Sequence, residues 1–292
     1  MAGGPDVRGE RAPRVAAACG CALGEGALWD HRDERLYWVD IVAPAIWWLE
    51  RNGETSRRNS PEPTGFVVLT PNENVLLAGL KSGLALIDLR DGRVQRLVSP
   101  EPDRSGNRIN DGTAGPDGSV YFGTMDERES KPSGRFWRYA RGELTPFGDS
   151  AIVTNGPAIA PKGDLIYTVH SAARVVFVHP LAAGVPGKAR LFVRFPEDWG
   201  HPDGLIVDAD EHVWVCHWGG GRITRFRPDA SVERVVPIPT PQVTKCAFGG
   251  ANLSTLYITT ARRGRPPSDT LAGHVFAVET DIRGVPARIA TV

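Results

Sequence analysis

The sequence has no surplus of charge of either sign and no long apolar run. Its 34 lysine and arginine residues are matched by 34 aspartate and glutamate residues, so the chain has no basic field that would attract nucleic acid or an anionic membrane surface. No segment approaches the roughly 18 consecutive apolar residues of a membrane-spanning helix, and the N-terminal segment lacks the apolar core of a signal peptide. We therefore expect a soluble, cytoplasmic protein that binds neither nucleic acid nor membranes.

Cysteine is also scarce, and a common catalytic motif is missing. The four cysteines are Cys19, Cys21, Cys216 and Cys246. They lack the paired spacing of a zinc site, and a reducing compartment would leave them as thiols. The sequence contains no Gly-x-Ser-x-Gly nucleophile elbow and no long amphipathic helical pattern. These absences argue against nucleophilic catalysis and against a helical fold.

What the sequence does contain is a repeated unit of strand, turn and strand. Its 33 glycines and 24 prolines suit many tight turns. A third segment of alternating or β-branched apolar residues follows each copy, as in Ala45–Leu49 and Ile223–Phe226. The period is roughly 40 to 47 residues, the length of a four-stranded propeller blade. The six copies begin near Gly26, Gly65, Asp111, Gly156, Gly204 and Cys246.

The predicted fold is therefore all-β, a six-bladed β-propeller with four-stranded blades. A chain of 292 residues with 41% hydrophobic content can bury a large core as one domain. We expect residues 14–292 to form a single catalytic propeller, preceded by a flexible tail of residues 1–13. The segment Arg14–Ala18 is expected to add a strand to the last blade and so close the ring. We expect a monomer or a weak homo-oligomer.

Three polar residues, Glu25, Asn155 and Asp203, each stand just before the first strand of a repeat. In a propeller these innermost strands converge on the axis, so the three side chains can meet. Two carboxylates and an amide carbonyl form a hard oxygen set suited to a divalent cation. Taken singly, Asn155 and Asp203 also fit turn pairs in which the side chain bonds its own backbone. The shared phase, and the Gly-Glu-Gly setting of Glu25, favour a metal site.

Arg108 and Asn110 occupy the corresponding place before the third repeat. Alternate residues of an extended segment point the same way, so this pair can hold a polyhydroxylated ligand. The alternative is a surface arginine followed by an Asn-Asp turn. Lys245, before the sixth repeat, has the same phase and is predicted to rim the pocket. Trp199 or Trp218 is predicted to lie near its mouth, where an indole can stack on a sugar.

Five motifs carry a family resemblance. They are LGEGALWD…LYWVDI, NRINDGTAGPDGSVYFGTM, TNGPAIAPKGDLIY, HPDGLIVDADEHVWV and TKCAFGG, in that order. They resemble the gluconolactonase/regucalcin family of six-bladed propellers, which are sugar lactonases that use a divalent metal. The similarity runs from about Leu23 to Ala261, and the wording is typical of bacterial aldonolactonases, including pentonolactonases.

The resemblance implies one divalent metal ion, Fe²⁺, Zn²⁺, Ca²⁺ or Mn²⁺, held by Glu25, Asn155 and Asp203. It also implies that Asp203 is the catalytic general base and that Arg108 and Asn110 bind substrate.

The family often has a sugar-binding acid shortly after Gly-Thr-Met. Strict counting leads here to Arg128, with Asp126 and Glu127 just before it. We take Glu127 as the candidate for this substrate contact.

The implied partner is a small sugar lactone, such as L-arabinono-, D-xylono- or D-glucono-lactone, and the implied reaction is its hydrolysis to the aldonate. Such an enzyme is a carboxylic ester hydrolase in which the metal polarises the carbonyl and activates water. Two other functions remain open from the residues: a calcium-binding regulatory propeller without obligatory catalysis, and a metal-dependent phosphotriesterase. A pocket with Arg108 and Asn110 aimed at hydroxyl groups favours sugars.

Overall fold

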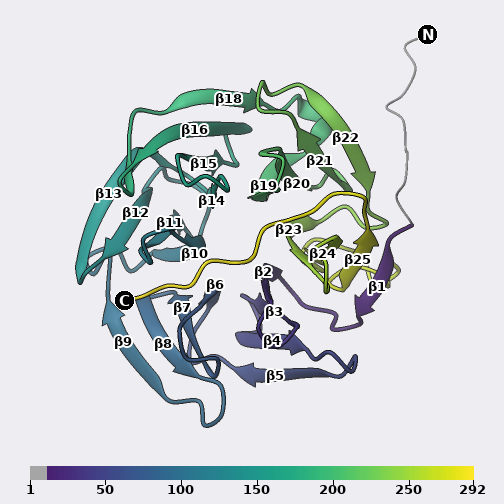
Figure 1. Ribbon diagram of the computed structural model, residues 1–292, viewed down its shortest axis with the longest axis horizontal. Coiled ribbons are helices and arrows are strands. Elements are labelled where there is room, and N and C mark those ends of the chain that lie inside the picture. The colour runs from purple at the N-terminus through teal and green to yellow at the C-terminus, as the bar shows by residue number, and fades with distance from the viewer. Residues whose placement is uncertain (1–11) are drawn as a thin grey trace.

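The computed structural model describes residues 12–292, so the expected tail of residues 1–13 lies almost wholly outside the described residues. These residues form 25 β-strands in six antiparallel sheets, with one short 3-10 helix, η1 (Glu197–Trp199). The sheets are arranged in a ring (Figure 1). The predicted all-β, six-bladed propeller is confirmed.

The first three blades follow the chain from the inside of the ring outward. Blade 1 contains β2 (Gly24–Asp30), β3 (Arg35–Asp40), β4 (Ala45–Leu49) and β5 (Thr55–Asn59). Blade 2 contains β6 (Thr64–Leu69), β7 (Val75–Leu80), β8 (Gly83–Asp88) and β9 (Val94–Val98). Blade 3 contains β10 (Asn107–Ala114), β11 (Val120–Asp126), β12 (Gly134–Ala140) and β13 (Glu143–Ala151).

Blade 4 carries one short extra strand, β17, which pairs with the end of β16. Its strands are β14 (Thr154–Ile159), β15 (Leu165–His170), β16 (Val175–Ala182), β17 (Val185–Pro186) and β18 (Arg190–Arg194). Blade 5 contains β19 (His201–Val207), β20 (Val213–Trp218), β21 (Arg222–Phe226) and β22 (Val232–Pro237). Blade 6 contains β23 (Val243–Gly249), β24 (Thr255–Thr260), β25 (Val275–Glu279) and β1 (Arg14–Ala17).

The ring is closed by its N-terminal strand, as the sequence predicted. Strand β1 pairs antiparallel with β25, placing Arg14 opposite Ala277 and Val15 opposite Phe276. The two ends of the propeller are thus joined by a backbone ladder in one sheet, so blade 6 is built from both termini of the domain.

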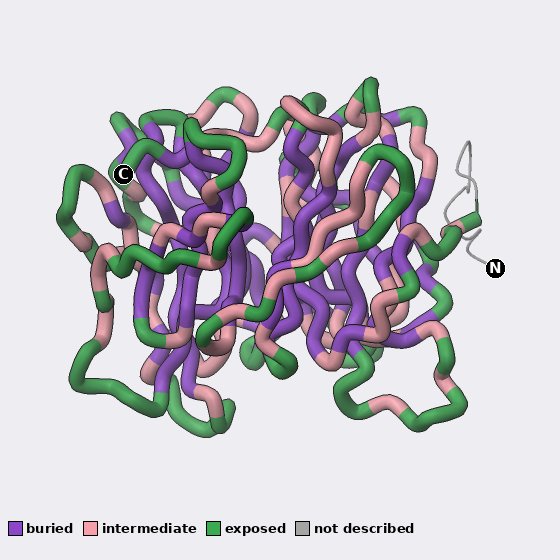
Figure 2. The backbone as a smooth tube through the Cα atoms, turned by 90° about the horizontal axis from the view of Figure 1, so that it is seen from below, coloured by how far each residue is buried: buried purple, intermediate pink, exposed green. Residues whose placement is uncertain are grey.

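The apolar core lies between neighbouring blades and is not gathered in one central cluster. Tyr37 of blade 1, for example, packs in one buried cluster with Val67 and Leu76 of blade 2. A further cluster joins blades 4 and 5 around Val176 and Val215. Figure 2 shows buried backbone through the body of the ring and exposed backbone in its loops. Packing of this kind leaves the polar ends of the innermost strands to line the axis.

The C-terminal segment, residues 283–292, crosses one face of the ring (yellow in Figure 1). Arg288 donates to the carbonyl oxygens of Ala160 and Pro161 at 2.8 and 3.1 Å. Its Nη1 also donates to the carbonyl oxygen of Ile159 at 3.4 Å, and the backbone of the segment makes further hydrogen bonds. Together they reach turns of five blades, at Ala209, Leu253, Ala160, Leu69 and Gly118.

Within residues 12–292 we find no helix of the length and apolar character needed to cross a bilayer. All four cysteines are free, and three of them are buried.

Candidate functional site

A bulge near the start of each innermost strand sets the direction of the candidate side chains. The register of β2 shifts between Glu25 and Leu28, and that of β14 shifts between Asn155 and Ala158. Gly26 and Gly156, which follow the two polar residues, have φ of 61° and 66°, in the left-handed region that favours glycine. A bulge re-aims a side chain out of the regular alternation, which explains why short Gly-containing motifs recur at these points.

The structure brings five of the predicted residues together in one pocket of about 380 Å³ at the start of the innermost strands. They come from four blades and are all buried. The five residues are Glu25, Arg108, Asn110, Asn155 and Asp203.

A chain of hydrogen bonds orders the amides of this pocket. Arg108 Nη1 donates to Asn110 Oδ1 at 2.6 Å, and Asn110 Nδ2 donates to Asn155 Oδ1 at 2.9 Å. Asn155 Nδ2 in turn donates to Ser171 Oγ at 2.9 Å. Since every amide nitrogen has a defined acceptor, the oxygen of Asn155 has a fixed direction and keeps one lone pair for a further partner.

The two carboxylates of the pocket are buried, and they make few hydrogen bonds that would offset the loss of solvent. Asp203 is only 6% exposed, and its Oδ1 has no hydrogen-bond partner within residues 12–292. Glu25 is 5% exposed and accepts a hydrogen bond from the N–H of Gly26 at 3.1 Å. Burial, with the nearby charge of Asp111, raises the pKa of Glu25 to about 8. Burial and the charge of Glu25 raise the pKa of Asp203 well above its usual range.

This donor set fits a divalent cation. In the part of the chain that the structure describes, no three histidine, cysteine, aspartate or glutamate side chains gather as a metal-binding group. The candidate set has only two such residues, Glu25 and Asp203, and takes its third oxygen from the amide of Asn155. A cation at the unpartnered Oδ1 of Asp203 would relieve the repulsion between the buried carboxylates. Hard oxygen ligands of this kind suit Ca²⁺, Mn²⁺ or Fe²⁺.

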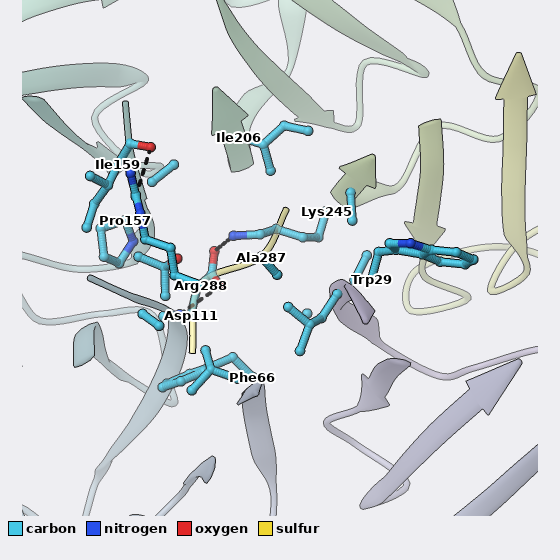
Figure 3. Close-up of a pocket in the computed structure, with 18 of the residues that line it drawn as sticks. Trp29, Phe66, Asp111, Pro157, Ile159, Ile206, Lys245, Ala287 and Arg288 are labelled. Atoms are coloured by element: carbon cyan, nitrogen blue, oxygen red, sulfur yellow. Dashed lines mark hydrogen bonds and ion pairs between the residues drawn. The ribbon is translucent and has the colours of Figure 1, made fainter. Parts of the chain in front are cut away.

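Lys245 does not line this pocket, contrary to the prediction that it would rim it. Its ammonium is bonded to the carboxylate of Asp111, and both residues are buried. They line a smaller cavity of about 140 Å³, further along the innermost strands, which Ala287 and Arg288 of the C-terminal segment cover (Figure 3). Burial lowers the pKa of Lys245, but the carboxylates of Asp111 and Glu25 outweigh it and raise the pKa overall.

The acids after Gly-Thr-Met lie in different places. Glu127, the candidate substrate contact, bonds Lys81 Nζ at 2.6 Å and does not line the pocket. Glu129 lines the pocket instead, 3.5 Å from Arg263. Asp126 accepts hydrogen bonds from the N–H groups of Ser130 and Lys131, both at 2.9 Å, and so shapes the loop.

Arg128 is exposed and does not line the pocket. Among the two candidate indoles, Trp218 lines the pocket. Trp199 packs against His217, with ring centroids 5.7 Å apart, and does not reach it.

His201 is a lining residue that the sequence reasoning missed. Its Nδ1 lies 3.0 Å from the carbonyl oxygen of Ser171, the residue whose hydroxyl accepts from Asn155. Because a carbonyl oxygen only accepts, Nδ1 is the donor of that bond. His201 precedes Asp203 by two positions on one strand, so period-2 alternation was a signal that would have found it.

Residues 23–262 match the family model described as SMP-30/Gluconolactonase/LRE-like region. An L-arabinolactonase from Azospirillum brasilense is 35% identical over 277 residues, which cover 90% of each chain. A 6-deoxy-6-sulfogluconolactonase from Pseudomonas putida is 32% identical over 270 residues, which cover 90% of this chain and 92% of that one. The crystal structure of a calcium-binding protein, regucalcin, from Agrobacterium tumefaciens has a TM-score of 0.92 at 26% identity, covering 96% of this chain and 98% of the other. The resemblance read from the five motifs is confirmed.

Proposed function

The chain belongs to the SMP-30/gluconolactonase/LRE-like family, and on that premise we propose that it is a metal-dependent sugar lactonase. The substrate is an aldono-lactone, with L-arabinono-lactone the first candidate because the L-arabinolactonase is 35% identical over most of both chains. One observation carries the proposal: the unpartnered, buried Oδ1 of Asp203 shares a pocket with the Arg108 and Asn110 pair.

In this mechanism Glu25, Asn155 and Asp203 would hold the divalent ion. A bound ion supplies Lewis-acid polarisation of the lactone carbonyl and lowers the pKa of a coordinated water. The carboxylate of Asp203 accepts a proton from the water whose oxygen adds to the carbonyl carbon. It returns this proton to the ring oxygen as the ring C–O bond breaks, so that the ring oxygen leaves as a hydroxyl group.

The remaining residues position the lactone. Arg108 donates to a ring hydroxyl group. Asn110, whose Nδ2 is occupied by Thr154 O and Asn155 Oδ1, accepts from one through Oδ1, and together the two side chains fix the angle of attack. The indole of Trp218 offers an apolar wall to the sugar ring, since it lines the same pocket.

The test is a panel of lactones assayed with purified protein that has been stripped of metal and refilled with Fe²⁺, Zn²⁺, Ca²⁺ or Mn²⁺. We expect acid release from at least one pentono- or hexono-lactone, restored by at least one ion and absent in Asp203→Ala. Full activity in the stripped protein, or in the variant, would refute the mechanism.

One observation favours a second function. The regucalcin from Agrobacterium tumefaciens, which shares the fold at a TM-score of 0.92, is described as a calcium-binding protein. A calcium-binding regulatory role would give a calcium-dependent rise in thermal stability with no turnover of any lactone in the panel. The phosphotriesterase alternative is tested by adding a phosphotriester to the same panel.

A further inference from the structure

A second pocket, of about 270 Å³, lies between blades 2 and 3 beside the candidate active site. It is bounded by the β5–β6 and β7–β8 turns, at Glu62 and Lys81, and by the loop of residues 99–107 that leads into β10. These segments all lie at the end of the ring where the innermost strands begin. Arg108 lines both this pocket and the larger one, so one residue is shared by the two pockets.

Most of the residues that line this second pocket carry a polar side chain. Its lining residues are Glu62, Lys81, Ser82, Ser99, Pro100, Glu101, Pro102, Arg104, Ser105, Asn107, Arg108 and Thr124. Only the two prolines have no polar side-chain atom. Polar side chains around a cavity can orient a hydroxylated ligand by hydrogen bonds.

The carboxylate oxygens of Glu101 and Glu62, which line this pocket, already accept hydrogen bonds from other groups of the protein. Glu101 Oε2 accepts from Asn107 Nδ2 at 2.7 Å, and its Oε1 accepts from Thr124 Oγ1 at 2.9 Å. Glu62 accepts from the N–H of Ser82 at 2.7 Å and pairs with Arg96 at 2.7 Å. Hydrogen-bond acceptors of a ligand therefore meet few competing acceptors here.

The donors, in contrast, are in surplus. Both hydrogen bonds of the Arg108 guanidinium come from Nη1, and its Nε and Nη2 have no partner within residues 12–292. Arg104 gives one bond, from Nη1 to Ser133 O at 2.8 Å, and Lys81 gives one to Glu127. Three cationic side chains that line one cavity thus keep unused N–H groups. Charged N–H donors bind carboxylate oxygens most strongly.

We propose that this pocket is a second ligand site for a small hydroxylated carboxylate, a sugar acid. Arg104, Lys81 and the Nε and Nη2 groups of Arg108 hold it. The choice of a sugar acid rests on the proposed function, because lactone hydrolysis releases a ligand of that class next to the pocket. The existence of an anion-binding site rests only on the surplus of donors.

The experiment is a calorimetric titration of the intact, metal-loaded protein with D-gluconate. Two variants target the pocket: Arg104→Gln removes a cation, and Ser105→Trp fills the space without changing charge. Arg190→Gln is the matched control, since Arg190 is an exposed arginine on the outer strand of blade 4. Sorbitol, acetate and inorganic phosphate serve as comparison ligands.

We expect two gluconate-binding events in the wild type and in Arg190→Gln, one of which is weakened at least tenfold by Arg104→Gln and by Ser105→Trp. Sorbitol lacks the carboxylate and should not produce that event. Unchanged isotherms in both pocket variants would overturn the proposal, and so would phosphate or acetate binding as tightly as gluconate, which would mark an unselective anion patch.

The outcome is separable from that of the lactonase proposal. If the chain hydrolyses no lactone but the Arg104-sensitive event persists, the proposed function fails and the second site stands. If lactone turnover is found and the event is absent in the wild type, the second site fails alone. Because Arg104 and Ser105 lie outside the larger pocket, kcat should stay within about twofold of the wild-type value in both variants.

Discussion

Asp111 and Lys245 form an ion pair across the central channel, although they lie 134 positions apart in the sequence. Their strands, β10 and β23, belong to blades 3 and 6, which are opposite each other in the ring (Figure 1). Both side chains are almost inaccessible to solvent. The pair joins the two halves of the propeller at its axis. The charge of Asp111 raises the pKa of the nearby Glu25, and the charge of Lys245 lowers it.

Replacing Lys245 by methionine should lower the free energy of unfolding by about 3–5 kcal/mol, because it leaves the carboxylate of Asp111 buried without its counter-ion. The measurement is chemical denaturation. The double variant Lys245→Met/Asp111→Asn should recover part of the loss, since neither charge then remains. Lys162→Met, which breaks an exposed ion pair with Glu211, is the control and should change stability far less, because solvent screens exposed charges. Equal effects of the two lysine substitutions would contradict this assignment.

Asp203→Asn should reduce lactone hydrolysis by about 10²–10⁴-fold, the usual contribution of a positioned general base. The metal-free variant should nevertheless be at least as stable as the metal-free wild type, because the substitution removes one of two repelling buried carboxylates. Initial rates and thermal denaturation of the same samples check both parts. Asp103→Asn, at an exposed position, should behave as wild type. A variant that is inactive only because it is unfolded would refute the second part.

Adding the correct divalent ion to stripped protein should raise its stability by about 2.7 kcal/mol at a concentration 100 times the Kd, because the ion binds only the folded site. Asn155→Ala should lose most of that gain, since it deletes one of the three oxygens. Asn252→Ala, at an exposed position, should keep all of it. The readout is the thermal midpoint as a function of ion concentration. An equal gain in both variants would show that the ion binds elsewhere.

Acid should destabilise the protein through His217. Burial lowers the pKa of His217 to about 3, whereas the unfolded value is about 6.5. Between these values the unfolded chain binds a proton that the folded chain excludes. Stability therefore rises with pH across this window and falls on acidification from 6.5 toward 3, by up to about 1.4 kcal/mol per pH unit.

The measurement is the free energy of unfolding at several pH values from 4 to 7. His217→Phe should flatten the slope, because it removes the titrating group. His31→Gln, at an exposed position, should leave the slope as it is in the wild type. Parallel slopes in wild type and His217→Phe would exclude His217 as the cause.

Arg288→Met should lower the free energy of unfolding by about 1–3 kcal/mol, because the carbonyl oxygens of Ala160 and Pro161 lose a charged donor. Lactone hydrolysis should be unchanged in the folded variant, since Arg288 lies toward the other end of the channel from Asp203. Arg283→Met keeps the backbone bonds of the same segment and is the control. A loss of activity without a loss of stability would show that the segment communicates with the site.

The sequence predicted the architecture and the candidate ligands for the same reason. Strand alternation and turn residues are local signals. Because the unit repeats roughly every 40 to 47 residues, the place of a residue within its repeat determines its place in the ring. Glu25, Asn155 and Asp203 share that phase, so their meeting in one pocket followed from the fold. Their roles as ligands stay predictions until the metal is measured.

Other features depend on contacts that no local pattern encodes. The loop after Gly-Thr-Met shows this: hydrogen bonds to Asp126 fold it so that Glu129 reaches the pocket while Glu127 turns to Lys81 of blade 2. Counting along the sequence cannot anticipate where such a loop turns.

By itself, then, the sequence determined the all-β class, the number of blades, the closing strand and the phase of the polar residues, because each depends on periodicity and turn chemistry within one repeat. Only the tertiary structure decided that Lys245 pairs with Asp111 across the ring and that the C-terminal segment covers one end of the channel. It also decided that Arg108 lines two pockets. These relationships join different repeats, and their geometry is fixed by packing and charge pairing between residues far apart in the chain.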